Sequence, residues 1–237
     1  MLLEAKPYLK QIELERDDHI DSSEYPFSTP AISNLHTLDF HADVTFFVGE
    51  NGTGKSTLME AIAVALGLNA EGGNKNYNFS TSDTHSELNQ KIKTIKSFKR
   101  PRDSFFLRAE SFYNLASFVD TIPEALMSFG SSLHEQSHGE SFMTTLLNKF
   151  KPNGLYLMDE PEAALSPSRQ MSAVSAIHQL VKKGSQFIIA THSPILLAYP
   201  NAKIYQFSQE EIKEVSYEET EHFSITRDFL NRHQEMM

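Results

Sequence analysis

The sequence contains no cysteine, which excludes disulfide bonds, thiolate zinc sites and thiol catalysis. No apolar run approaches the roughly 20 residues of a membrane-spanning helix, and the N-terminus has no signal-peptide pattern. We therefore expect a cytoplasmic protein with no membrane insertion. Basic residues are few, with 21 Lys and Arg against 31 Asp and Glu and a formal net charge of -10. This balance argues against a protein that coats nucleic acid through its overall charge.

Apolar segments alternate with helical patterns along most of the chain. With 40% apolar residues the chain can bury a full core, and we expect a single domain over residues 1–237. Short apolar runs predict strands at residues 44–49, 104–110, 155–160 and 186–192. Strands that alternate with helices predict the α/β class with a largely parallel, covered sheet, preceded by short N-terminal strands.

Two long segments separate the predicted strands. Residues 69–86 are rich in Gly, Asn, Ser and Thr, which predicts a mobile surface loop. Residues 111–150 are mostly helical in pattern, with an interruption at Pro123, and are expected to form a lobe inserted into the domain.

The segment GENGTGKS matches the pattern G-x-x-x-x-G-K-[ST] in full, between a predicted strand and a predicted helix. Glycines let the backbone curl so that N–H groups point at phosphate oxygens, and the following helix offers its positive end. Lys55 is placed to reach the terminal phosphates, and the Ser56 hydroxyl can ligate Mg²⁺. The pattern predicts a nucleoside triphosphate site whose binding residues are Gly49, Asn51, Gly52, Thr53, Gly54, Lys55, Ser56 and Thr57.

Two carboxylates follow the apolar strand LYLM. A carboxylate at the carboxyl end of a strand beside a phosphate loop is placed to hold a metal ion, and Asp159 is the candidate. Glu160 is then free to polarise a water molecule for in-line attack, as a general base. On its own DEPE also fits a solvated turn after a core strand.

Two weaker motifs flank this pair. FIIATHSP places His192 at the end of another apolar strand, 32 residues beyond Glu160. EQSHGESF, residues 135–142, comes earlier, with Ser137 lying 22 residues before Asp159. A lone strand-end histidine is more often structural, so the order of the motifs carries more weight than either alone.

In that order the motifs resemble an ABC-type ATPase head over residues 44–194. Ser137 and Gly139 stand in the serine and second-glycine positions of the family's signature, while His138 replaces its first glycine and Glu140 its glutamine. The chain is similar to the SMC and recombination-repair ATPases, to the ATPase part of overcoming-lysogenization-type nucleases, and to small stand-alone bacterial ATPases that carry RAESFYN and DEPEAALSP.

The resemblance implies a P-loop NTPase fold with N-terminal antiparallel strands and a short helical signature lobe. It also implies ATP and Mg²⁺ as cofactors and a homodimer that forms on ATP binding. Each ATP would lie between one subunit's loop and the partner's Ser137, Gly139 and Glu140. Lys55, Glu160 and His192 would then be the catalytic residues.

Three departures from the family matter. Its glutamine after the middle strand has no obvious counterpart, and Glu110 is the residue expected to contact the metal or the water instead. Only about 26 residues lie between that place and the signature, too few for a transporter's helical lobe. Ser166 stands where the family often has aspartate.

The sequence gives weaker evidence on which residue contacts adenine and on what partner the protein binds. An aromatic ring ahead of the loop often stacks on the base in such proteins, and Tyr25 is our choice over Phe27, Tyr8 and Arg16. The segment KIKTIKSFKRPR, residues 91–102, carries a local charge of +6. It could grip DNA, bind an acidic effector protein, or form a solvated face, which is the commoner case.

Three functions remain open. The first is an ATP hydrolase that cycles between monomer and ATP-clamped dimer and acts on a partner. The second is an ATP-sensing switch with little turnover that regulates an effector such as a nuclease or toxin. The third, a P-loop kinase, leaves the signature and His192 unexplained. Glu160 favours the first, because a sensor does not need a base.

Overall fold

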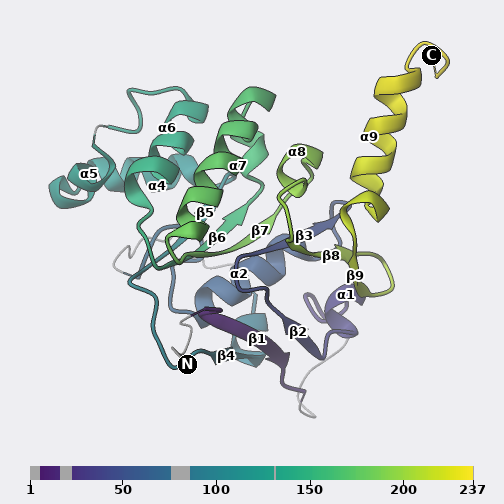
Figure 1. Ribbon diagram of the computed structural model, residues 1–237. Helices are drawn as coiled ribbons and strands as arrows, with labels where there is room; N and C mark the ends of the chain where they lie inside the picture. Colours follow the sequence, from purple (N-terminus) through teal and green to yellow (C-terminus); the bar gives the residue numbers. More distant parts are fainter. Residues whose placement is uncertain (1–5, 17–22, 76–85, 131, 237) are drawn as a thin grey trace, which may run out of the picture.

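The computed structural model describes residues 6–16, 23–75, 86–130 and 132–236, and within these residues the strands form two sheets (Figure 1). The larger sheet has six strands in the order β5-β6-β7-β3-β8-β9. All neighbours are parallel except β9, which pairs antiparallel with β8. The strands are β3 (Val44–Gly49), β5 (Asp103–Arg108), β6 (Gly154–Asp159), β7 (Gln186–Ala190), β8 (Lys203–Phe207) and β9 (Ile212–Val215).

The central strands are buried on both faces, as their continuous apolar runs predict. Every residue of β3, β6 and β7 is buried. Alternate side chains of β3 enter different cores: Phe46 packs in one hydrophobic cluster and Phe47 in the other. Since successive side chains of a strand point to opposite faces, this division places one core on each side of the sheet.

The smaller sheet is antiparallel, with the order β2-β1-β4. Its strands are β1 (Leu9–Leu14), β2 (Thr37–Asp39) and β4 (Ile92–Lys96). Helix α2 (Lys55–Ala65) shares its core with both sheets: Leu58 and Ile62 belong to the cluster that contains Ile12 of β1 and Ile188 of β7. The N-terminal antiparallel strands expected from the sequence are therefore present, and they cover α2 from outside.

The other face of the larger sheet carries the helical lobe. The lobe elements are α4 (Phe112–Asp120), α5 (Pro123–Phe129), α6 (His138–Thr144) and a π-helical turn at Thr145–Lys149. Helix α7 (Pro167–Lys182), which follows β6, packs in the same core. Phe112, Phe129 and Phe142 of the lobe pack in the same core as Phe105 and Phe187 of the sheet. Pro123 opens α5, so the interruption predicted there is confirmed.

Short helices and a C-terminal helix complete the fold. The short ones are α1 (Pro30–Ser33), α3 (Leu88–Lys91), α8 (Pro194–Leu197) and the 3₁₀ turns Pro161–Ala164 and Tyr217–Glu219. Helix α9 (Glu221–Arg232) has no buried residue, and Figure 1 shows it projecting from the sheets at the C-terminal end.

The expectation of a mobile surface loop over residues 69–86 is wrong for its first part. Ala70 and Glu71 are buried, and Gly73 exchanges backbone hydrogen bonds with Phe106 of β5 at 2.7 and 2.9 Å. Residues 76–85 lie outside the described part. Composition suggested a loop, but pairing with a strand over 30 residues away decides the structure of this segment.

Across the described ranges, none of the helices combines the length and the apolar character that crossing a bilayer would need.

Candidate functional site

The phosphate loop joins β3 to α2, as predicted. Its glycines Gly49, Gly52 and Gly54 all have positive φ, which L side chains rarely adopt. At Gly49 a Cβ would lie 2.3 Å from the carbonyl oxygen of Phe207 on β8, so only glycine fits beside that strand. The glycine conformations therefore give the loop its curved shape without a bound ligand.

Lys55 lies folded across the loop. Its Nζ donates to the carbonyl oxygens of Gly49 at 2.7 Å and Glu50 at 2.8 Å, and the residue is buried. Thr53 Oγ1 also donates to the Glu50 oxygen, at 2.8 Å. Burial lowers the Lys55 pKa, which the nearby Glu160 and Asp159 carboxylates partly oppose. A phosphate group would offer this ammonium stronger acceptors than carbonyls.

Asp159 ends β6 directly beside the loop. Ser56 Oγ donates to its Oδ1 at 3.2 Å, and burial raises the pKa of Asp159 to about 6 while Arg108 acts to lower it. A hydroxyl and a carboxylate that meet at the loop are oxygen donors of the kind Mg²⁺ takes in phosphate sites. The predicted pair of metal ligands is therefore brought together, and the donor set fits the ion.

Glu110, the third predicted metal ligand, does not contact Ser56 or Asp159 directly; Arg108 lies between Glu110 and Asp159. The Arg108 guanidinium donates to Glu110 at 3.0 Å and to Glu60 at 2.9 Å, and its Nε lies 3.7 Å from Asp159 Oδ2. The Glu110 side chain is exposed. Sequence reasoning did not single out Arg108, although it lies two residues before Glu110 at the end of β5.

Glu160 has an unusual backbone for a non-glycine residue. Its φ and ψ of 50° and 50° are left-handed, and its N–H donates to the Ala190 oxygen of β7 at 2.9 Å. Such conformations cost about 1–3 kcal/mol and concentrate at functional sites. The side chain is half-exposed and lines a cavity of ≈ 280 Å³ over the phosphate loop.

His192 faces this carboxylate. Its Nε2 lies 3.6 Å from Glu160 Oε1, and its Nδ1 lies 3.1 Å from Nε2 of His222 in the first turn of α9. Burial lowers the pKa of both histidines, and the Lys55 charge lowers both further. Glu162 accepts hydrogen bonds from His192 N and, at 2.7 Å, from Thr191 Oγ1.

His222 and Glu162 were not found from the sequence. Glu162 belongs to the DEPE segment and could have been suspected from it. His222 lies 30 residues beyond His192, at the start of a helix that follows an acidic segment, and no local pattern marks it. Only the fold brings the two rings together.

Tyr25 lies against the loop, as expected. Its hydroxyl lies 2.6 Å from Thr57 Oγ1, although the residue is 68% exposed. It also lines the ≈ 280 Å³ cavity, with Thr29, Asn51, Gly52, Gly54, Lys55, Ser56, Thr57 and Glu160. The alternatives Phe27 and Tyr8 are core residues, and Arg16 donates to the Ser33 oxygen. An exposed ring at the loop is available for stacking on a base.

The signature segment forms the start of α6. Ser137 caps this helix: Glu140 Oε2 accepts from Ser137 N at 3.0 Å and from Ser137 Oγ at 2.6 Å. These bonds hold the pKa of the Glu140 carboxyl below its usual range. Arg169 of α7 donates to Glu140 Oε1 at 3.2 Å. At Gly139 a Cβ would lie 2.7 Å from the Ala164 oxygen, so a side chain there would push the turn off its support.

The structure brings the loop, Asp159, Glu160, His192 and Tyr25 to one edge of the sheet. The signature residues are elsewhere: among the described residues that line the loop cavity, none comes from residues 135–142. The predicted signature residues therefore do not line the loop cavity of the same chain.

Two known proteins are similar to this chain in sequence. The chain is 28% identical over 212 residues to a "Putative ABC transporter ATP-binding protein" of Methanothermobacter marburgensis, covering 79% of this chain and 74% of that one. It is 23% identical to a protein of the same description from Bacillus cereus, covering 77% of this chain but only 35% of the relative's length.

Solved structures share the fold. An SMC head bound to the C-winged helix domain of ScpA superposes with a TM-score of 0.53 at 17% identity, covering 89% of this chain and 98% of that one. A nucleotide-free ATP-binding cassette from an ABC transporter gives 0.50 at 17% identity, covering 93% and 95%. The family model described as an AAA domain (AAA_23) matches residues 30–233. The chain therefore belongs to this AAA domain family and has the α/β P-loop fold of an ABC-type, SMC-like ATPase head.

Proposed function

We propose that this protein hydrolyses ATP in a homodimer that clamps two nucleotides, and that opening and closing of the dimer drives a change in a partner. The observation that carries the proposal is that Lys55, Ser56 and Glu160 line one loop cavity while the signature turn does not. Asp159 contacts Ser56, and His192 faces Glu160. A site with its phosphate loop in one copy and its signature in the other accounts for both facts.

Each side chain has a place in the reaction. Lys55 and the loop N–H groups bind the phosphate oxygens, and the ring of Tyr25 stacks on the adenine. Ser56 and Asp159 would hold Mg²⁺, which would supply charge neutralisation at the phosphates, while Glu110 pairs with Arg108 and is not one of the ligands. Glu160 accepts a proton from the attacking water, and His192 donates a hydrogen bond to the terminal phosphate. Ser137 and the start of α6 bind that phosphate from the partner copy.

A Glu160→Gln variant tests the base. It should bind ATP with parental affinity, hydrolyse it at least about 100-fold more slowly, and accumulate as a dimer, because a missing general base slows chemistry without removing binding groups. Calorimetry, phosphate release and light scattering measure the three quantities. Glu162→Gln, at the second carboxylate of the same turn, is the comparison variant. Turnover at the parental rate in Glu160→Gln would exclude the assignment.

An ATP-sensing switch with little turnover is the second candidate, and Glu140 favours it. Its carboxylate holds both Ser137 donors, N–H and Oγ, that a partner's phosphate would need. A Glu140→Gln variant separates the two functions. A strong rise in the hydrolysis rate would mean that Glu140 limits turnover in the native chain, as a sensor requires. An unchanged rate would mean that the carboxylate does not keep the Ser137 donors from a partner's phosphate.

A further inference from the structure

A larger hollow lies at the opposite edge of the sheet from the phosphate loop. It has a volume of ≈ 760 Å³, and its wall includes Leu66 after α2, residues 97–102 between β4 and β5, and Asp103 at the start of β5. Strands β5 and β6 pair from Asp103 to Arg108, where the other site begins. At 3.3 Å per residue the two sites are about 17 Å apart along the strands.

The wall of this hollow is strongly basic in an acidic protein. Its charged residues are one carboxylate, Asp103, and five cations, Lys75, Lys96, Lys99, Arg100 and Arg102. Within the described ranges, no ion pair joins any of the five cations to a carboxylate. Asp103 instead accepts a hydrogen bond from the Tyr156 hydroxyl at 3.1 Å. The net chain charge of -10 makes this a local exception.

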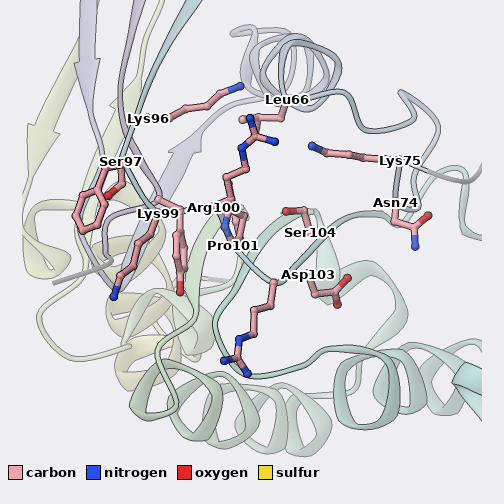
Figure 2. A pocket seen from close by; sticks show the side chains of 14 residues that line it. Leu66, Asn74, Lys75, Lys96, Ser97, Lys99, Arg100, Pro101, Asp103 and Ser104 are labelled. Atoms are coloured by element: carbon pink, nitrogen blue, oxygen red, sulfur yellow. The ribbon is translucent and has the colours of Figure 1, made fainter. Parts of the chain in front are cut away.

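Three of the cations converge. Figure 2 shows the ends of Lys75, Lys96 and Arg100 directed toward one region of the pocket, near Leu66. Burial lowers the Lys96 pKa, and the positive charges of Lys75 and Arg100 lower it further. Like charges held at one point repel, and a group with several anionic oxygens relieves that repulsion. A phosphate matches this better than a single carboxylate, because it offers more acceptors and can carry more charge.

The rim adds an exposed ring and neutral polar groups. Phe98 is 64% exposed, with Lys99 Nζ 5.8 Å from its ring centroid. Asn74, Ser97 and Ser104 line the same pocket. Proteins that bind single strands combine cations along the backbone with aromatic rings on which bases stack. A single strand offers both phosphates for the cations and free bases for the ring, whereas the bases of a duplex are already stacked on one another and an acidic peptide offers carboxylates in place of phosphates.

We propose that this pocket binds single-stranded nucleic acid, with backbone phosphate at Lys75, Lys96 and Arg100 and a base stacked on Phe98. The pocket lies apart from the nucleotide site, so the assignment does not depend on ATP hydrolysis. It would let a chain of net charge -10 bind a polyanion at one local basic site.

The test uses the full chain without ATP and a fluorescein-labelled oligothymidylate of about 12 nucleotides, within the size range of one such binding module. Fluorescence anisotropy measures its affinity. The double variant Lys96→Glu/Arg100→Glu should bind at least about tenfold more weakly, and Phe98→Ala several-fold more weakly, as base stacking on a ring predicts. For three phosphate contacts, log K against log salt should have a slope of about -2.

The matched control is Lys213→Glu/Arg232→Glu, which changes net charge by the same amount at exposed positions of β9 and α9, at the far end of the strand order from β5. It should bind within about twofold of the parent, because it leaves the pocket intact. Thermal melting and calorimetry with ATP verify that Lys96→Glu/Arg100→Glu is folded and still binds nucleotide.

Three results would overturn the proposal. One is no saturable binding of the oligonucleotide, and another is equal loss in the pocket and control variants. The third is tighter binding of a labelled oligoglutamate peptide of equal charge with no effect of Phe98→Ala, which would identify an acidic protein segment as the ligand instead.

Discussion

Charged groups are arranged differently where the parallel strands of the larger sheet end, here the carboxyl edge, and where they start, the amino edge. At the carboxyl edge, ionisable groups are matched: Arg108 contacts three carboxylates, and Lys55 lies near Glu160 and Asp159. At the amino edge, the positive charges of Lys75 and Arg100 act on Lys96 and lower its pKa. Matched charges fix a geometry, as chemistry at a phosphate requires. Unmatched charges attract a polyanion without fixing its position, as sequence-independent binding requires.

The largest expected effect is on ATP binding. It is measured by removing one lysine from each edge in turn and comparing the two variants. Lys55→Ala should weaken ATP binding at least about 100-fold, since the residue makes charge-assisted contacts to phosphate in a buried site. Lys96→Ala should leave ATP binding unchanged. Calorimetry measures both, and equal losses would show that nucleotide is not bound at the carboxyl edge alone.

Hydrolysis should also need a second copy at the carboxyl edge. Ser137→Arg places a long cation at the signature turn and should abolish turnover while leaving ATP binding by the isolated chain intact. Mixed with Lys55→Ala, it should regain about one working site per heterodimer, because each variant supplies the half that the other lacks. Phosphate release measures the recovery, and its absence would exclude a shared site.

A smaller effect concerns the histidine pair and pH. Both histidines have a folded pKa lowered below the ordinary 6.5, so the unfolded state binds protons first. Their contribution to stability is complete above about pH 6.5 and falls as the pH falls. His222→Gln should therefore lose less thermal stability than the parent between about pH 7.5 and 5.5. Thermal melts measure this, and equal losses would show that the pair is not responsible.

The smallest effect is at the amino edge. Lys96→Met removes a cation that burial and two like charges disfavour, so it should raise the melting temperature by about 1–2 °C, as expected of a surface substitution in a chain of this length. Lys93→Met is the control, since Lys93 lies 3.5 Å from Glu13 and has an ion pair to lose. A lower melting temperature for Lys96→Met would show that the cation stabilises the fold.

Local patterns predicted the parts of the site that one segment builds. β3, the glycine loop and the start of α2 follow from consecutive residues, and the burial of β6 and β7 follows from their apolar runs. The contact of Tyr25 with Thr57 agrees with a weaker expectation. Each of these features depends on sequence neighbours or on the known order of motifs.

Features built from distant segments could not be predicted in the same way. His222 meets His192 only because α9 begins beside the end of β7. Gly73 pairs with Phe106 although its neighbours have loop composition. The basic stretch was expected to be a solvated face, and Lys96, Lys99 and Arg100 are exposed, but local sequence could not show that Lys96 shares a pocket with Lys75 from another segment. Tertiary pairing outweighs local composition in each case.

The close approach at Gly139 has a consequence for how paired sites communicate. The carbonyl of Ala164 supports the back of the signature turn, and it ends the 3₁₀ turn that begins directly after Glu160. In the proposed assembly, the segment that carries the base for one nucleotide would thus contact the turn that binds the other. Five residues of backbone, from Glu160 to Ala164, would connect the two sites across the dimer axis.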